Sequence, residues 1–417
     1  MIKRLLQSDL VANRYYAFGL AVQKGTPFLV VPLVVWAFGA QAYANYVLTF
    51  AATQLVAMAM SLGTTNSLVV FWYQHEDKSR YLRSLILLIS GLTLLIGFCV
   101  FALLTATSIL PTGVIPRPLW AVTIVLFGAI YNWNAVGLSL VRVTERSRRY
   151  FLTVLVTTGI LLLLVVGVSR MMQGTLPLIM IYMAVMALQS ALFFAAVPLR
   201  VTGRELLPGY RQFTRRIFGY SVPVVAYTLV SLSVFTVDKW VIRSFYPDAE
   251  FTQYVLNFQF AFATNIVAVV IGMYLLPMLC RLVESEDRKE MAHKVHSHYL
   301  LSLVGTFVVG VGMYVYGRVT GVGLTGDYWI LVMAFGFSNL FTVNVNVLEA
   351  FRNSRTLARI ALIPTALFWL GFVLAAASEA LVWNYWLFGA YYAGLFASSL
   401  SRVVGQGVPI GLADRAT

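Results

Sequence analysis

The residues with the clearest chemical potential in this chain are charged side chains inside apolar stretches. Lys24 lies about ten residues after Arg14, in a segment that is otherwise apolar. At a helical rise of 1.5 Å per residue, its position is roughly 15 Å deep in a bilayer. A charge at that depth is costly, and it commonly faces a water-filled cavity or a charged partner. We therefore expect Lys24 to face a central aqueous cavity. A lysine that extends back to the membrane surface is the alternative.

Asp238 and Lys239 are adjacent near the outer end of another apolar stretch. Adjacent helix positions point about 100° apart, so the two side chains are not expected to pair with each other. We expect them to act in gating or ion coupling, with Asp238 contacting a basic residue of the other half or a coupling cation. A membrane-interface anchor beside Trp240 is the alternative. Glu349 is a third gating or ion-coupling candidate, and a local ion pair with Arg352 is its alternative.

Uncharged polar side chains also recur inside the apolar stretches. The amides expected to contact a ligand are Gln54, Asn132, Asn257 and Asn265. Amides donate and accept hydrogen bonds, as a ligand rich in hydroxyl groups requires. Tyrosines such as Tyr254 offer rings on which a sugar can stack. The alternative role for these residues is hydrogen bonding and packing between helices, at about 0.6 kcal/mol per hydrogen bond.

The chain carries no recognisable catalytic or cofactor pattern. Three histidines, His293, His296 and His298, lie near acidic residues, but their spacing matches no metal motif and favours a solvated loop. The sequence has no phosphate-binding glycine loop, no HExxH and no GxSxG. We expect no metal, no cofactor and no catalytic residue.

The composition is that of a protein that crosses a membrane many times. Of the 417 residues, 60% are hydrophobic and 11% are charged, whereas a soluble domain carries roughly 25% charged residues. The apolar runs are continuous rather than alternating, which predicts an all-α integral membrane protein instead of a β-barrel. Twelve transmembrane helices are predicted at residues 12–37, 43–72, 84–109, 118–141, 150–169, 176–199, 217–240, 252–280, 298–317, 327–348, 357–377 and 380–401.

The basic residues predict the orientation of these helices. With the N-terminus in the cytoplasm, 24 of the 30 lysines and arginines fall in seven cytoplasmic segments that alternate with outer ones. Both termini are then cytoplasmic. The same distribution accounts for most of the net charge of +14, so no nucleic-acid partner is needed. An alternative for the first helix is a signal peptide, because Ala40-Gln41-Ala42 resembles a cleavage site.

Three short matches between the two halves indicate an internal repeat. YVLTF at residues 46–50 returns as YVLNF at 254–258, and ATQLVA at 52–57 returns as ATNIVA at 263–268. Ser147-Arg148 also returns as Ser354-Arg355. The spacing is close to half of the chain, so we expect two six-helix lobes, residues 1–203 and 204–417, with pseudo-two-fold symmetry. Parallel halves with polar residues between them are typical of transporters.

Four segments, at residues 24–39, 43–63, 141–155 and 220–242, followed by YVLNF, resemble bacterial polysaccharide flippases. The chain is similar in this pattern to Wzx-type flippases of the multidrug/oligosaccharidyl-lipid/polysaccharide exporter superfamily. It departs from them at residues 69–72, VVFW, where related chains tend to carry a basic residue near the end of the second helix.

The resemblance implies a transporter of the bacterial inner membrane that works by alternating access. Its substrate would be an undecaprenyl-diphosphate-linked oligosaccharide for O-antigen, exopolysaccharide or a related surface polymer, with Lys24 meeting the diphosphate. Membrane lipids, a polysaccharide polymerase and a chain-length regulator would be its partners.

Two other functions remain open from the sequence. A multidrug or small-molecule antiporter of the same fold would favour acidic cavity residues for organic cations, and these are scarce here. A membrane polysaccharide polymerase or ligase usually has a large outer loop with catalytic residues, whereas the outer loops predicted here are short and contain no histidine.

Overall fold

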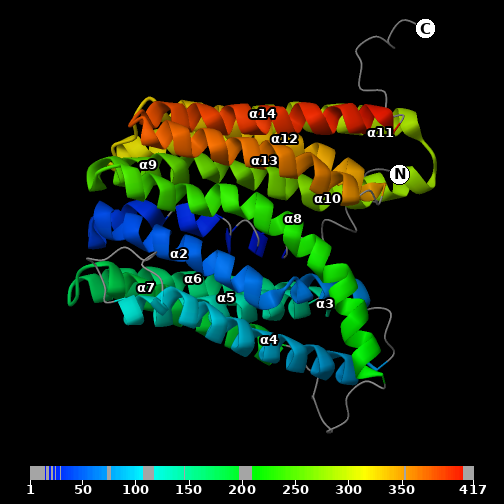
Figure 1. Ribbon diagram of the computed structural model, residues 1–417, viewed down its shortest axis with the longest axis horizontal. Coiled ribbons are helices and arrows are strands. Elements are labelled where there is room, and N and C mark those ends of the chain that lie inside the picture. Colours follow the sequence, from blue (N-terminus) through cyan, green and yellow to red (C-terminus); the bar gives the residue numbers. More distant parts are fainter. Residues whose placement is uncertain are drawn as a thin grey trace, which may run out of the picture. The chain divides into compact units, whose positions relative to one another are not determined.

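The computed structural model of this chain is nearly all helical, which confirms the all-α part of the predicted fold class. It describes residues 15, 18–19, 22–23, 25–28, 30–72, 77–106, 117–144, 146–196, 209–351 and 354–406. The named elements (Figure 1) are α2 (Ala40–Ser61), α3 (Thr64–Trp72), α4 (Lys78–Ala106), α5 (Arg117–Val143), α6 (Ser147–Ser169), α7 (Thr175–Ala196), α8 (Tyr210–Phe245), α9 (Asp248–Phe262), the 3-10 turn η1 (Ala263–Asn265), α10 (Ile266–Glu284), α11 (Arg288–Val319), α12 (Tyr328–Ala350), α13 (Ser354–Ala377) and α14 (Leu381–Gly405).

Eight helices in the described part of the chain are long and apolar enough to cross a membrane. They are Lys78–Ala106, Pro118–Val141, Ser147–Ser169, Thr175–Ala195, Asp248–Gly272, Arg288–Val319, Tyr328–Leu348 and Arg359–Ala377. A helix satisfies its backbone hydrogen bonds internally, as the bilayer interior requires. α2, α8 and α14 coincide with further predicted spans but are not among the eight. The count of twelve and the placement of both termini therefore remain predictions.

The chain divides into two compact units, Met1–Val237 and Asp238–Thr417. The boundary falls inside α8, whose part from Tyr210 to Val237 belongs to the first unit. The predicted lobes at residues 1–203 and 204–417 remain a prediction. Each unit is described below by itself.

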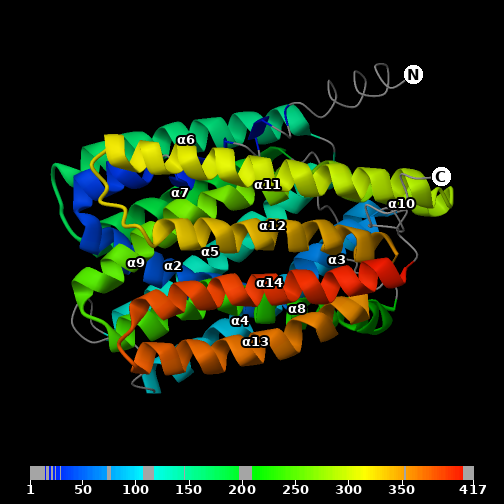
Figure 2. The same ribbon diagram turned by 90° about the horizontal axis from the view of Figure 1, so that it is seen from above.

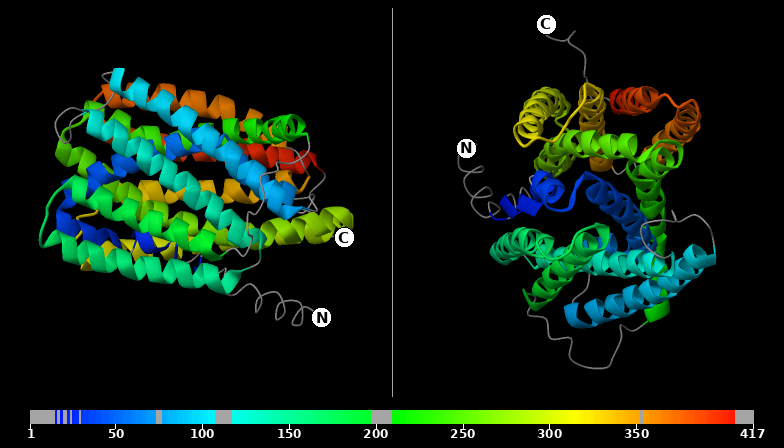
Figure 3. Two further views of the ribbon diagram at one scale, coloured as in Figure 1. Left: turned by 90° about the horizontal axis from the view of Figure 1, so that it is seen from below. Right: turned by 90° about the vertical axis from the view of Figure 1, so that its left-hand side faces the viewer.

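In the first unit, α5 is the central helix. It packs against α2, α3, α4, α6 and α7. The left view of Figure 3 shows α4, α5, α7 and α6 side by side in that order. Phe127 and Val136 on α5 are fully buried, as expected for a helix with neighbours on several sides.

In the second unit, α12 has the equivalent position. It packs against α9, α10, α11, α13 and α14. Figure 2 shows α11, α12, α14 and α13 side by side, which is the order that the repeat predicts from α4, α5, α7 and α6. The two units thus share one internal arrangement, whereas the symmetry axis that would relate them remains a prediction.

Two of the predicted spans are interrupted helices rather than continuous ones. The segment predicted at 43–72 is divided into α2 and α3 at Leu62 and Gly63, which have φ values of 41° and 70°. Left-handed φ values end an α-helix, and glycine adopts them without strain. The segment predicted at 252–280 is divided by η1, a stretch of three residues in which the α-helix tightens into a 3-10 helix.

Gly63 also occupies a tight contact, so its replacement tests this break. A Cβ atom at Gly63 would lie 2.6 Å from Val225 Cγ2 and 2.9 Å from the Ser221 carbonyl oxygen. Gly63→Ala is therefore expected to destabilise the protein by about 2 kcal/mol or more, from strain at positive φ and overpacking. Thermal unfolding in detergent measures the change. The matched control is Gly159→Ala in α6, where the added Cβ meets nothing within 4 Å and stability should not fall.

Reporter fusions test the predicted orientation of the helices. Fusions after Ile115, Gly174 and Thr325 should all report an outer location. Gly174 lies between α6 and α7, and Thr325 lies between α11 and α12, whereas Ile115 falls outside the described residues. A cytoplasmic signal at any of the three positions would contradict the orientation derived from the basic residues.

Candidate functional site

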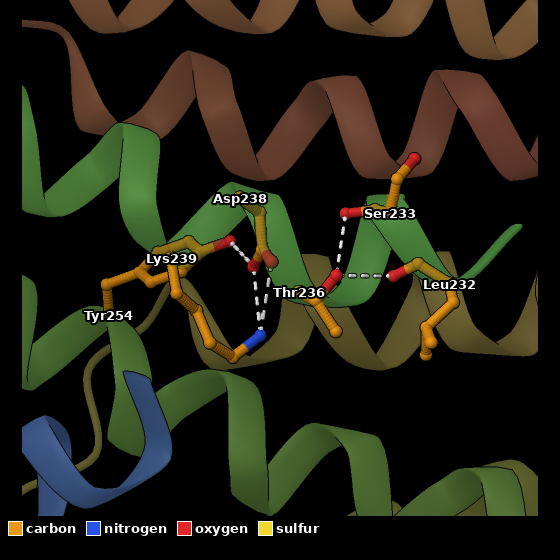
Figure 4. A network of polar contacts seen from close by, with 6 residues as sticks. All are labelled: Leu232, Ser233, Thr236, Asp238, Lys239 and Tyr254. Atoms are coloured by element: carbon orange, nitrogen blue, oxygen red, sulfur yellow. Dashed lines mark hydrogen bonds and ion pairs between the residues drawn. The ribbon is translucent and has the colours of Figure 1, made fainter. Parts of the chain in front are cut away.

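Asp238 and Lys239 form an ion pair, which corrects the expectation that these neighbours do not pair. The Lys239 ammonium donates to both carboxylate oxygens of Asp238, at 3.2 Å to Oδ1 and 3.1 Å to Oδ2. Figure 4 shows the lysine chain bending back along α8 to reach the carboxylate. The two Cβ atoms do diverge, but four methylene groups give the ammonium enough reach to return.

The pair is buried inside the protein. Asp238 is 0% exposed and Lys239 is 2% exposed. The alternative of an anchor at the membrane interface requires exposure that these side chains lack in the structure. They are also the only charged residues among the buried side chains of the described part of the chain.

α9 supplies the other contacts of this pair through the repeated YVLNF segment. The Tyr254 hydroxyl donates to Asp238 Oδ2 at 2.6 Å, and the Lys239 Nζ lies 3.8 Å from the centre of the Phe258 ring. Tyr254 and Phe258 are four residues apart, so they share one face of α9. A carboxylate, an ammonium, a phenol and an aromatic face thus meet in one buried cluster, hereafter the Asp238 cluster.

The C-terminal end of α8 has a second, separate ion pair. Arg243 bridges to Asp248 at the start of α9, and its guanidinium lies 5.4 Å from the Phe251 ring centre. The positive charge that Arg243 brings to this end is therefore neutralised locally. Asp248 has a side chain that is 61% exposed, so this pair contributes less to stability than a buried one.

Asn257, predicted to contact a substrate, has a structural role in the second unit. Its Nδ2 donates to Thr325 Oγ1 at 2.6 Å and to the Tyr385 hydroxyl at 3.5 Å. Its Oδ1 accepts from the Thr325 backbone N–H and from Gln253, both at 3.2 Å. The amide thus holds the loop between α11 and α12 against α9, with its donor and acceptor groups in use.

Asn257→Ala is expected to destabilise the protein by about 1–3 kcal/mol, because it leaves buried partners without hydrogen bonds. Asn265→Ala is the matched control, since Asn265 is half-buried in η1 and its side chain makes no hydrogen bond to the described residues. Thermal unfolding of both variants in one detergent makes the comparison. Equal losses of stability in the two variants would contradict the structural role of Asn257.

Gln54 and Asn132 lie in the first unit, on α2 and α5. Gln54 is half-buried and hydrogen-bonded to the Tyr131 hydroxyl. Asn132 is 2% exposed, and its Nδ2 donates to Thr93 Oγ1 at 3.1 Å. Its Oδ1 is buried without a hydrogen-bond partner among the described residues. The amides are therefore divided between the two units, and their contact with a substrate remains a prediction.

The structure also places a basic side chain beside residues 69–72, the apolar end of the second predicted span. The Arg216 guanidinium, from the start of α8, lies 4.9 Å from the Phe71 ring centre in α3. Phe213 and Ile217 of α8 pack in the same buried cluster as Phe71 and Trp72, which brings the two segments together. A positive charge from another helix of the same unit thus lies beside the apolar end of the second predicted span.

Solved structures of other proteins share this arrangement of helices. The inward-facing structure of a multidrug resistance MATE family transporter of the MOP superfamily matches with a TM-score of 0.68 and 11% identity, over 96% of this chain and 100% of that one. The lipid II flippase MurJ, in an inward closed conformation, matches with a TM-score of 0.67 and 12% identity, over 93% and 87% of the chains. This chain has the MATE-type fold.

A third structure agrees with this assignment. The MATE multidrug transporter DinF-BH, in complex with a ligand, matches with a TM-score of 0.66 and 12% identity, over 98% and 97% of the chains. No protein-family model and no curated protein matches the sequence. The MATE-type fold together with the eight apolar helices makes this a multi-pass membrane protein.

Two predicted site residues cannot be placed on this MATE-type fold in atomic detail. Lys24 lies outside the described residues. Glu349 belongs to α12, but its side chain, like Arg352, is outside them as well. The expected roles of Lys24 and Glu349 remain predictions.

The sequence reasoning missed the partners that complete the Asp238 cluster. Tyr254 was expected to stack on sugars, whereas its hydroxyl donates to a carboxylate and its ring stacks on Tyr385, with centres 5.5 Å apart. Phe258 was not singled out. The signal that could have found both is the repeat, since YVLTF and YVLNF keep an aromatic residue at both ends of the segment.

Proposed function

We propose that this protein flips an undecaprenyl-diphosphate-linked oligosaccharide from the inner to the outer leaflet of a bacterial inner membrane by alternating access. The oligosaccharide would serve the synthesis of a surface polysaccharide such as O-antigen or exopolysaccharide. A polysaccharide polymerase and a chain-length regulator would receive the product. The chain itself would transport its substrate without covalent chemistry.

The observation that carries the proposal is that the buried carboxylate of Asp238 already has partners within the protein. Asp238, the buried carboxylate of the described residues, is bound to Lys239 and Tyr254. It is therefore not available to an organic cation. Lys24, the cationic candidate for the cavity, would favour an anionic substrate over a cationic one. A diphosphate needs such compensation, because an unpaired charge in a low-dielectric cavity is prohibitively costly.

Specific residues have stated roles in this proposal. Lys24 would bind the diphosphate in the cavity, and Arg216 would meet it at the cytoplasmic side. Gln54, Asn132 and Asn265 would hydrogen-bond the sugar hydroxyls. The unpaired Oδ1 of buried Asn132 is the group best prepared to accept such a hydrogen bond.

The second candidate is a multidrug or small-molecule antiporter. It is favoured by the likeness to MATE transporters, which is as close as the likeness to MurJ. An organic cation would then need a carboxylate other than Asp238. The side chain of Glu349 is one that the sequence offers. A membrane polymerase or ligase has no comparable support.

Transport into proteoliposomes decides between these functions. The purified protein should move a fluorescent undecaprenyl-diphosphate oligosaccharide across the bilayer, measured by enzymatic access to the sugar from outside. It should not drive uptake of ethidium, a fluorescent organic cation. Uptake of ethidium without movement of the lipid-linked sugar would support the antiporter and overturn the flippase. In cells, depletion of the protein should leave the lipid-linked sugar on the cytoplasmic leaflet. Chemical analysis of the sugar that accumulates there would identify the substrate.

A further inference from the structure

We infer that Lys239 is a built-in counter-ion, whose ammonium fills the position that a free monovalent cation would take at Asp238. The protein would then carry its own cation at this site, and removal of the Lys239 charge would turn the Asp238 cluster into a binding site for sodium. For transport, the inference rests on the proposed function. The site itself can be tested without any transported substrate.

The ligand set around the ammonium is one that suits a small monovalent cation. Both oxygens of the Asp238 carboxylate face the Lys239 Nζ, at 3.2 and 3.1 Å. The Tyr254 oxygen is joined to the same carboxylate at 2.6 Å, and the Phe258 ring faces the Nζ at 3.8 Å. Carboxylate oxygens are hard ligands for metal cations, and an aromatic face attracts cations of any kind. Figure 4 shows the ammonium and the carboxylate pointing toward each other.

The covalent attachment of the Lys239 ammonium to α8 decides which cation occupies the site. Lys239 is the residue next to Asp238 on the same helix, so its ammonium accompanies the carboxylate through any movement of α8. An attached group competes with free ions at a very high effective concentration. A free cation would have to displace the ammonium, which would then lose its bonds to the Asp238 carboxylate at a position that is only 2% exposed.

The remaining charged groups nearby do not offer an alternative partner for Asp238. Arg243, four residues further along α8, is bridged to Asp248. Tyr385, whose ring stacks on Tyr254 with centres 5.5 Å apart, adds a second phenol close to the cluster. Among the described residues, the carboxylate of Asp238 is thus balanced by Lys239 alone, and the pair is neutral.

The inference predicts how sodium affects the purified protein. Thermal unfolding is measured in detergent at pH 8, in sodium chloride and in choline chloride of equal ionic strength. The wild type should show no difference between the two salts. Lys239→Met should unfold at a lower temperature in choline chloride, and sodium should raise this temperature by about 2 °C or more in a concentration-dependent manner. The double variant Asp238→Asn/Lys239→Met should lose the sodium effect, because the carboxylate is gone.

Two results would overturn the inference. One is a sodium-specific stabilisation of the wild type that Asp238→Asn abolishes, since a free ion would then occupy the site beside Lys239. The other is a Lys239→Met protein that folds but does not respond to sodium. If Lys239→Met does not yield folded protein, Lys239→Gln takes its place, and the comparison of wild type with Asp238→Asn still decides the first result.

A transport measurement extends the test. In proteoliposomes, the wild type should flip the lipid-linked oligosaccharide equally well with sodium or choline, and Lys239→Met should become sodium-dependent. A wild type that flips no lipid-linked sugar would refute the proposed function, yet leave the salt effects on unfolding to decide the inference about Lys239.

Discussion

Asp238→Asn is expected to destabilise the protein by about 3–5 kcal/mol, because it removes the carboxylate that accepts from the buried Lys239 ammonium. The substitution keeps the size of the side chain, so the loss reports electrostatics rather than packing. The double variant Asp238→Asn/Lys239→Met should recover most of the stability, since a neutral pair of similar volume replaces a neutral ion pair. Unfolding of the single and double variants in detergent gives the coupling energy of the pair.

The chain offers a matched control for this prediction. Asp248→Asn removes the partner of Arg243 at the C-terminal end of α8, where the aspartate side chain is 61% exposed. An exposed ion pair is worth about 1 kcal/mol or less, so Asp248→Asn should be close to neutral. Similar losses from the buried and the exposed substitution would contradict the burial of the Asp238 and Lys239 pair.

Export by the same variants tests the gating role of Asp238. If the carboxylate holds the outer gate, Asp238→Asn should lower export at all pH values, and the double variant should restore stability without restoring export. If Asp238 only balances Lys239, export should return with stability in the double variant. Normal export by Asp238→Asn across the pH range would end the gating proposal.

Lys24→Ala is the second prediction with a large expected effect. It should abolish export while leaving the protein inserted in the membrane at normal abundance. The physical reason is that a diphosphate entering a low-dielectric cavity requires a cationic partner at that depth. Lys24→Arg should retain part of the activity, since it keeps the charge but changes the hydrogen-bond geometry.

The readouts for Lys24 are the amount of surface polysaccharide and the amount of protein in the membrane fraction. Arg14→Ala is the matched control, because Arg14 lies at the predicted cytoplasmic end of the same span and its loss should weaken export far less. Full export by Lys24→Ala would show that the lysine only extends back to the membrane surface.

Much of the helix pattern could be predicted because each apolar stretch is a local property of the chain. α5, α6 and α7 begin within a few residues of the spans predicted from hydropathy. The interruptions of two predicted spans could not be predicted in this way. Gly63 ends a helix through its backbone conformation, and the apolar residues around it are the same with or without a break.

The sequence predicted which residues belong to the candidate site, but it did not predict which residues they contact. Asp238, Lys239 and Asn257 stood out because polar groups are rare in apolar stretches. Their contacts depend on Tyr254, Phe258 and other groups that hydropathy does not distinguish. The expectation that Asp238 and Lys239 do not pair failed because it considered the direction of the Cβ atoms and neglected the reach of the lysine chain.

The sequence by itself determined that this is a helical membrane protein with an internal repeat and a few charges in apolar surroundings. Those properties depend on how each segment partitions between water and lipid, which is decided by its own residues. Only the tertiary structure decided that Lys239 faces Asp238, that α9 supplies a phenol to the same carboxylate, and that Asn257 binds a loop 68 residues away. Such contacts depend on how each helix is rotated against its neighbours. Lipid is as apolar as the helix surfaces, so hydropathy leaves that rotation open, and side-chain packing and hydrogen bonds select it.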